Sequence, residues 1–237
     1  MKIDYIFCNE HIKISQPDHI FKYSLDSLVL ASFVKINKSN QKVLEIGAGS
    51  GAISLILADR NKNIFIDAVE IQESVFEILK ENIVINKFEN KIKAINKNIN
   101  EVKNICQTDT YDIIVSNPPY FFEREKPVEK ELLIARHGDS LTLENIMSVS
   151  RKLLKNKGKL FISYPPTETS GVIIEAKKQN LEVKRIKYFF SFNKKSNVAL
   201  FEISKQAKSG VIIEMPIITN DFNGNYTDEL KKYIKGR

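Results

Sequence analysis

The sequence predicts an α/β fold in which helices cover both faces of a doubly wound, mostly parallel sheet. Short apolar runs of strand length alternate with helix-like patterns from residue 42 to residue 179, as in successive βαβ units. Two further apolar runs, at residues 182–190 and 196–204, are separated by only a few residues. That short connection predicts an antiparallel C-terminal hairpin within the otherwise parallel sheet.

The first half of the chain supplies three strands and three helices. Apolar residues within 20–36 recur at the i, i+3, i+4, i+7 spacing of a helix, and Ser24 can cap it. The other elements have strand-length apolar runs or helical periodicity. Strands are predicted at residues 42–47, 64–70 and 91–98, and helices at 52–60 and 72–86.

The second half continues the pattern. Residues 111–116 and 159–165 read as buried strands, and a helix at 142–155 is expected to end at Gly158. The remaining predicted elements are a helix at 168–179, an extended piece at 210–218 and a terminal helix at 227–235.

Length and composition fit one domain with additions. The chain has 237 residues and 43% hydrophobic content, enough for a sizeable core. We expect a single domain with an N-terminal gate segment (1–40), a Rossmann-like core (41–204) and a C-terminal extension (205–237). With no apolar run of about 18 residues, we expect no membrane span, and the early Asp4 and Glu10 argue against a signal peptide.

Cysteine content and charge limit the kinds of binding partner that we expect. Two cysteines stand far apart without a CxxC motif, which favours a reduced, cytoplasmic protein with no cysteine-based metal site. No metal and no obligate protein partner is expected. Residues 151–237 hold 18 Lys and Arg against 8 Asp and Glu. This excess favours a polyanion such as RNA, although a general lysine bias would also produce it.

A glycine loop follows the first predicted strand. Gly47, Gly49 and Gly51 are spaced GxGxG between a strand and a helix, where glycine allows a sharp turn and close approach of a ligand. The spacing differs from the GxGxxG of dinucleotide sites. Glu45 precedes the loop and Glu70 ends the second strand, where a carboxylate can accept from both hydroxyls of a ribose.

The predicted strand 111–116 stops abruptly at Asn117-Pro118-Pro119-Tyr120. A nitrogen conjugated with a ring or carbonyl is a poor nucleophile, so transfer of a group to it needs acceptors that hold its N–H groups and aim the lone pair. The side-chain oxygen of Asn117 and the carbonyl of Pro118 can serve, the prolines keep that carbonyl rigid, and Tyr120 offers a ring for stacking a flat base. A proline turn with a buried tyrosine is the structural alternative.

These two motifs resemble those of Rossmann-like, S-adenosylmethionine-dependent methyltransferases. The resemblance implies that Glu70 holds the ribose, that Ile71 packs on the adenine and that Asn98 stands where an acid often receives the adenine amine. The NPPY motif itself is similar to that of N-methyltransferases acting on adenine, cytosine, guanine or glutamine, and does not choose among them.

Further segments lie along nearly the whole chain, and they include "FKYSLDSLVLASF", "DAVEIQ" and "NYTDEL". Together with the two motifs, these segments resemble, in the same order, the bacterial tRNA1(Val) adenine-37 N6-methyltransferase family. The resemblance implies N6-methylation of an adenine in tRNA and a gate segment that closes over the methionine end of the cofactor. The gate residues are Lys22, Tyr23 and Asp26, where core packing of Tyr23 is an equal alternative. Arg136, after NPPY, is expected to meet RNA phosphate or to be solvated.

Three rivals use related features. A protein glutamine methyltransferase of the release-factor type carries a helical substrate domain before the glycine loop, for which 46 residues leave too little room. A DNA adenine methyltransferase needs a sizeable target-recognition insert, and no insert of that size is visible in the sequence. A silent RNA-binding module would not be expected to keep Asn117 and the glycines intact. We therefore favour tRNA, and expect its backbone to lie near the basic residues of the hairpin, which are Lys184, Arg185, Lys187, Lys194 and Lys195.

Overall fold

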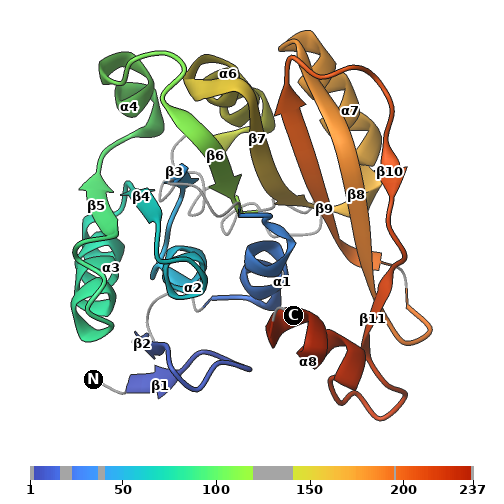
Figure 1. Ribbon diagram of the computed structural model, residues 1–237. Helices are drawn as coiled ribbons and strands as arrows, with labels where there is room; N and C mark the ends of the chain where they lie inside the picture. The colour runs from blue at the N-terminus through green and yellow to red at the C-terminus, as the bar shows by residue number, and fades with distance from the viewer. Residues whose placement is uncertain (1–2, 17–22, 37–40, 120–140, 195, 236–237) are drawn as a thin grey trace, which may run out of the picture.

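The computed structural model describes residues 3–16, 23–36, 41–119, 141–194 and 196–235. A central sheet crosses the molecule in the strand order β10-β8-β9-β7-β6-β3-β4-β5, with β11 also paired to β8 (Figure 1). Its main strands are β3 (Gln41–Ile46), β4 (Ile64–Glu70), β5 (Ile92–Asn96), β6 (Tyr111–Ser116), β7 (Leu154–Tyr164), β8 (Leu181–Ser191) and β9 (Ser196–Lys205).

The strand directions confirm the predicted fold class. Neighbouring strands from β5 to β7 are parallel, whereas β9 runs antiparallel to both β7 and β8. The sheet is therefore mostly parallel, and the antiparallel C-terminal hairpin strand lies where the short connection predicts it.

Helices cover both faces of the sheet (Figure 1). One face carries α1 (Leu25–Phe33), α2 (Ala52–Arg60), α3 (Glu73–Ile85) and α8 (Asp228–Lys235); the other carries α4 (Ile99–Ile105), α6 (Leu143–Leu153) and α7 (Thr169–Lys178), the last preceded by a 3-10 turn, Pro166–Glu168. Side chains of β3 alternate between the two layers: Val43 packs in the cluster under α1 and α2, and Leu44 packs in the other cluster. Because both faces of the strand are covered, β3 is buried continuously from Val43 to Ile46.

Several predicted elements match the structure to the residue, and one helix end is wrong. Strands 64–70 and 111–116 and helix 52–60 are confirmed. The helix expected to end at Gly158 stops at Leu153, and Gly158 lies inside β7. Glycine is needed there for space, since a Cβ would lie 2.8 Å from a backbone oxygen.

The N-terminal part forms a small hairpin separate from the main sheet. Strands β1 (Ile3–Tyr5) and β2 (Lys13–Ser15) pair antiparallel. They lie beside α2 and α3 in Figure 1. Sequence patterning did not predict this hairpin because each strand has only three residues.

The C-terminal extension adds to the outer edge of β8. The predicted extended piece is divided into β10 (Ile212–Ile213) and β11 (Ile217–Asn220), which both pair parallel with β8. The terminal helix α8 then packs against α1 and β11. In the described part of the chain, no helix is long and apolar enough to cross a membrane.

The topology gathers the predicted site residues on one edge. Strands β3, β4, β5 and β6 are adjacent and parallel, so their carboxyl ends meet at the same side of the sheet. Ligands of open α/β sheets bind at this side.

Candidate active site

The glycine loop has a backbone that favours glycine at all three positions. The φ angles of Gly47, Gly49 and Gly51 are 71°, 57° and 90°, in the left-handed region. A Cβ on Gly51 would lie 2.6 Å from Leu79 of α3, whereas a Cβ on Gly49 would meet nothing within 4 Å. Gly51 is therefore needed for helix packing, and Gly49 borders open space above the loop.

Glu70 ties this loop to the end of β4. Its side chain is 4% exposed, and its two carboxylate oxygens accept from the backbone N–H groups of Gly49 and Gln72, both at 2.9 Å. A carboxylate has about four acceptor positions. Two of these are used here, and the chemistry of the group allows it to accept from a pair of ligand hydroxyls as well.

Glu45, which sequence reasoning grouped with the cofactor-binding residues of the loop, is buried and bonded to α2. It is 1% exposed and accepts hydrogen bonds from the backbone N–H of Ser54, at 3.0 Å, and from the Ser54 hydroxyl. Burial raises the pKa of Glu45 to about 8, and the nearby Glu70 adds to the rise. Glu45 therefore supports the first turn of α2 from inside the core.

Two asparagines at and just after the end of β5 have different roles. Asn98 caps α4: its side-chain oxygen accepts from the N–H of Asn100 at 2.9 Å, and Glu101 completes the capping box. Asn96, which sequence reasoning missed, donates to the carbonyls of Glu70 and Ile71 at 3.0 and 3.2 Å. These bonds fix the backbone at half-buried Ile71, beside the proposed ribose acid.

The end of β6 carries Asn117, Pro118 and Pro119. Just before them, the Ser116 hydroxyl donates to the carbonyl of Ile46 at 3.0 Å and joins the ends of β6 and β3. The amide nitrogen of Asn117 donates to the hydroxyl oxygen of Ser27 at 3.0 Å. This bond sets the rotation of the amide, with its nitrogen turned toward α1. Tyr120 lies outside the described residues.

Ser27 is a site residue that sequence reasoning missed. It lies in the first turn of α1 and is 9% exposed. The resemblance singled out Tyr23 and Asp26 but not Ser27. Only the folded chain shows that Ser27 contacts Asn117, which is 90 residues away in sequence. A small polar residue beside an acidic one at a helix start gives no separate signal.

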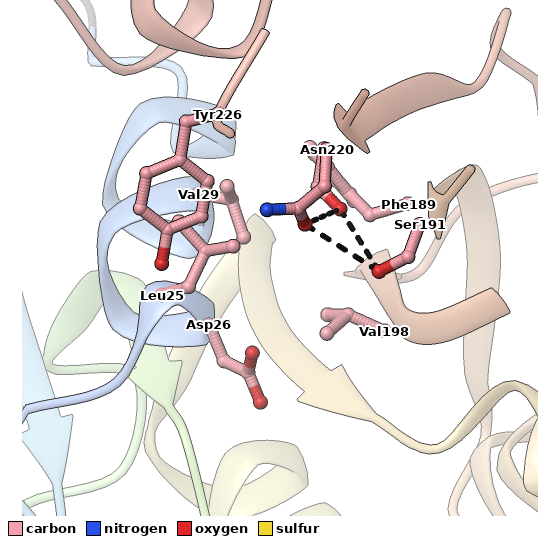
Figure 2. Close-up of a pocket in the computed structure, with 9 residues that line it drawn as sticks. Leu25, Asp26, Val29, Phe189, Ser191, Val198, Asn220 and Tyr226 are labelled. Atoms are coloured by element: carbon pink, nitrogen blue, oxygen red, sulfur yellow. Dashed lines mark hydrogen bonds between the residues drawn. The ribbon is translucent and has the colours of Figure 1, made fainter. Parts of the chain in front are cut away.

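The gate residues have different environments. The Tyr23 hydroxyl accepts from the backbone N–H of Phe7 at 3.1 Å and so holds the N-terminal hairpin. Asp26 lines a cavity of about 170 Å³ between α1 and the outer strands (Figure 2). Burial raises its pKa to about 6. Lys22 lies outside the described residues.

Asn82 links the loop to the N-terminal hairpin and was also missed. From α3 it accepts from the backbone N–H of Ser15 at 2.7 Å and donates to the carbonyls of Ser15 and Ser50 at 3.1 and 2.9 Å. Gln16 adds a bond to the Ser50 hydroxyl at 2.8 Å. The sequence signal that could have identified Asn82 is a polar residue between apolar positions of an amphipathic helix.

The structure corrects the prediction that Arg185 and Lys187 lie near RNA. Both are 8% exposed. Arg185 bonds Glu202 at 2.8 Å, Glu214 at 2.7 Å and the carbonyl of Phe33 at 3.0 Å. Lys187 donates to the carbonyl of Met215 at 2.8 Å. Acidic partners and overlying segments enclose these cations, so they join α1 and the C-terminal extension to β8.

The other basic residues divide between bound and exposed. The ammonium of Lys184 donates to the carbonyls of Lys208 and Gly210 at 2.8 and 2.7 Å. Lys194 is exposed in the turn between β8 and β9. Arg136 and Lys195 lie outside the described residues.

The fold and this edge of the sheet define a Rossmann-like methyltransferase. The methyltransferase small domain model matches residues 23–191, and the chain belongs to that family. It is 37% identical over 154 residues to a tRNA1(Val) (adenine(37)-N6)-methyltransferase of Trichodesmium erythraeum, with 64% of each chain covered. A protein of the same name from Parabacteroides distasonis is 32% identical over 167 residues, covering 69% of this chain and 68% of the relative.

Solved structures agree on the fold. A predicted O-methyltransferase from Agrobacterium tumefaciens superposes with a TM-score of 0.69 at 16% identity, covering 90% of this chain and 98% of the other. At this identity, the likeness concerns the arrangement of the sheet and helices.

Proposed function

We propose that this protein transfers a methyl group from S-adenosylmethionine to N6 of an adenine in tRNA, and that the target is adenine 37 of tRNA1(Val). The observation that carries the proposal is the Asn117-Pro118-Pro119 strand end, oriented by Ser27 and placed beside the glycine loop. The names of the relatives supply the nucleic acid and the nucleotide. We place the reaction in the cytoplasm, where tRNA is found.

The residues of the loop fit S-adenosylmethionine. The open space at Gly49 can admit a ligand against the backbone, and the Glu70 carboxylate beside it can accept from two ribose hydroxyls. Ile71, fixed by Asn96, offers an apolar surface to the adenine ring. Asn98 keeps its proposed role as an acceptor for the adenine amine, since capping uses one of the two lone pairs of its side-chain oxygen.

When bound, the cofactor supplies an electrophilic methyl group. The task of the chain is to turn a delocalised amine into a nucleophile. The side-chain oxygen of Asn117 and the carbonyl of Pro118 accept from the two N–H groups of the target, and this draws the lone pair out of conjugation. Two consecutive prolines hold the carbonyl without reorganisation, and the Ser27 bond does the same for the amide. We assign stacking of the target base to Tyr120.

Binding of tRNA requires cations other than the buried ones. Lys194, exposed in the β8–β9 turn, keeps its predicted role near phosphate, and we retain Arg136 and Lys195 as further candidates. The ammonium of Lys184 already donates to the carbonyls of Lys208 and Gly210. To bind RNA, it would have to exchange these carbonyls for a phosphate.

The direct test offers the purified protein a choice of substrates. The protein is incubated with labelled S-adenosylmethionine and either bulk tRNA or release-factor protein, and the products are digested for mass spectrometry. We expect N6-methyladenosine in tRNA. Methylglutamine in the protein, with unlabelled tRNA, would establish the release-factor type of methyltransferase instead.

A further inference from the structure

A cavity of about 170 Å³ lies between the start of α1 and the outer strands of the sheet. Figure 2 shows Leu25, Val29 and Tyr226 on one side, Asn220 and Ser191 on the other, and Asp26 with Val198 toward one end. Among the described residues that line the cavity, none belongs to the glycine loop.

The cavity adjoins the proposed methyl-transfer site. Asp26 precedes Ser27, whose hydroxyl holds the amide of Asn117. The strand pairings place Ser116 opposite Ile162, and Tyr164 opposite Ala199. The end of β6 and the start of β9 therefore lie on the same edge of the sheet. A group bound in the cavity would lie beside a base held by Asn117.

One wall of the cavity is polar and internally bonded. The side-chain oxygen of Asn220 accepts from the Thr219 hydroxyl at 2.8 Å and from the Ser191 hydroxyl at 3.5 Å, and its nitrogen donates to the carbonyl of Gly224 at 2.9 Å (Figure 2). The opposite wall is aliphatic and aromatic. This combination gives a rigid slot with apolar contact on one side, which suits a flat ring.

Asp26 is the ionisable group of this slot. Its carboxyl is largely removed from water, which raises its pKa to about 6, and its own backbone N–H partly offsets the rise. It is therefore mostly charged at neutral pH and is a strong acceptor for N–H donors. A nucleobase with an amino group offers such a donor at the edge of a flat ring.

Exposed aromatic residues lie close in sequence to residues that line the cavity. Tyr226 is 39% exposed, Phe192 47% and Phe222 79%. The backbone N–H of Phe192 donates to the carbonyl of Asn220 at 3.2 Å, which joins the two turns that carry these rings. Lys194 follows Phe192 by two residues and is exposed. Aromatic rings interleaved with cations form the usual surface for unpaired nucleotides.

We propose that this cavity binds the base of an unpaired nucleotide directly beside the target adenine, with Asp26 accepting from its amino group and Tyr226 stacking on its ring. The proposal rests on the proposed function for its RNA substrate. It assigns Asp26 to the RNA, whereas the family resemblance assigns it to the methionine end of the cofactor.

The test uses anticodon stem-loop RNAs in which each neighbour of the target adenine is replaced in turn by the other three bases. The variants are Asp26→Asn and Tyr226→Ala, which change different elements of the fold. Their controls are Asp228→Asn and Tyr5→Ala, which alter exposed side chains elsewhere. The readouts are kcat and KM for each RNA, and the affinity for S-adenosylhomocysteine measured by calorimetry without RNA.

We expect the native protein to prefer an amino-bearing base at one neighbour position by about tenfold in kcat/KM, as for a hydrogen bond to a charged acceptor. Asp26→Asn should lose most of this preference, whereas Tyr226→Ala should raise KM for every RNA, because stacking is sequence-tolerant. Both variants should keep the affinity for S-adenosylhomocysteine, and the controls should behave like the native protein. The proposal is overturned by an undiminished preference in the Asp26→Asn protein, by an unchanged KM in the Tyr226→Ala protein, or by an Asp26→Asn protein that loses S-adenosylhomocysteine affinity without RNA. If the native protein methylates no RNA, it is the proposed function that fails, and this subsite falls with it.

Discussion

The two halves of the sheet use polar residues in opposite ways. Around β3, β4 and β6, polar groups at the strand ends hold the loop and one another: Glu70 accepts from Gly49, which borders open space, and Asn117 is oriented by Ser27. Around β8 and its added strands, the most conspicuous charges are buried and paired. Arg185 is bonded to Glu202, Glu214 and the carbonyl of Phe33.

The difference shows that residue type and strand position do not carry the same information. A polar residue at the carboxyl end of a parallel strand is placed at the ligand edge by topology. A basic residue in the middle of a strand can face an acidic partner as readily as solvent. A local charge excess therefore indicates a polyanion only after buried pairs are removed from the count.

The largest effect should follow removal of the Asn117 amide. Asn117→Ala deletes one of two acceptors for the target amine, and we expect the methylation rate to fall by about 10²–10³-fold or more. Affinity for S-adenosylhomocysteine should be unchanged, since the glycine loop is intact. Asn223→Ala, in an exposed turn, is the control. Equal rates for the two variants would remove Asn117 from the mechanism.

The next largest effect should be on folding, in the other half of the sheet. Arg185→Gln removes the buried cation that Glu202 and Glu214 share and leaves them with Lys159 and Lys187, so we expect a loss of about 3 kcal/mol in the free energy of unfolding in urea, at the low end of the range for a broken buried pair. The matched change Lys232→Gln alters an exposed lysine of α8 and should stay within about 0.5 kcal/mol. A stability loss no larger than that of the control would mean that Arg185 is not a structural cation.

Alanine substitutions at two glycines of the loop should distinguish a role in helix packing from a role in ligand binding. Gly51→Ala places a methyl group 2.6 Å from Leu79, and we expect overpacking to cost about 1–3 kcal/mol in addition to backbone strain. Gly49→Ala carries backbone strain without a steric neighbour, so it should be less destabilising but should weaken S-adenosylhomocysteine binding. Native cofactor affinity in the Gly49→Ala protein would show that the open space is not the ligand site.

A further effect, which accumulates with pH, is a dependence of stability on the ionisation of Glu45. Its pKa rises on folding from an ordinary 4.5 to about 8, so the folded chain keeps a proton that the unfolded chain releases. This disfavours folding increasingly as the pH rises from 4.5 to 8, by at most about 1.4 kcal/mol per pH unit. Glu45→Gln, which keeps the shape and stays neutral, should flatten that decline in urea unfolding. An identical decline in both proteins would show that Glu45 is not its source.

The sequence predicted positions at the carboxyl edge of the sheet where local rules and topology coincide. The strand-loop-helix at Gly47–Gly51, the acid at Glu70 and the stop at Asn117 each follow from neighbouring residues, and their roles in binding and catalysis stay predictions. Ser27 and Asn82 could not be found, because their partners are distant in sequence and are met only through packing. Burial of Arg185 likewise depends on segments that approach from both ends of the chain.

The most direct test of the central claim maps the methyl group within one tRNA. Transcripts of tRNA1(Val) with adenine or guanine at nucleotide 37 are incubated with the native protein and S-adenosylmethionine, and their nuclease fragments are analysed by mass spectrometry. The proposed function predicts N6-methyladenosine at nucleotide 37 of the first transcript and no methylation of the second. Equal methylation of both transcripts, or none of either by a protein that binds S-adenosylhomocysteine, would contradict it.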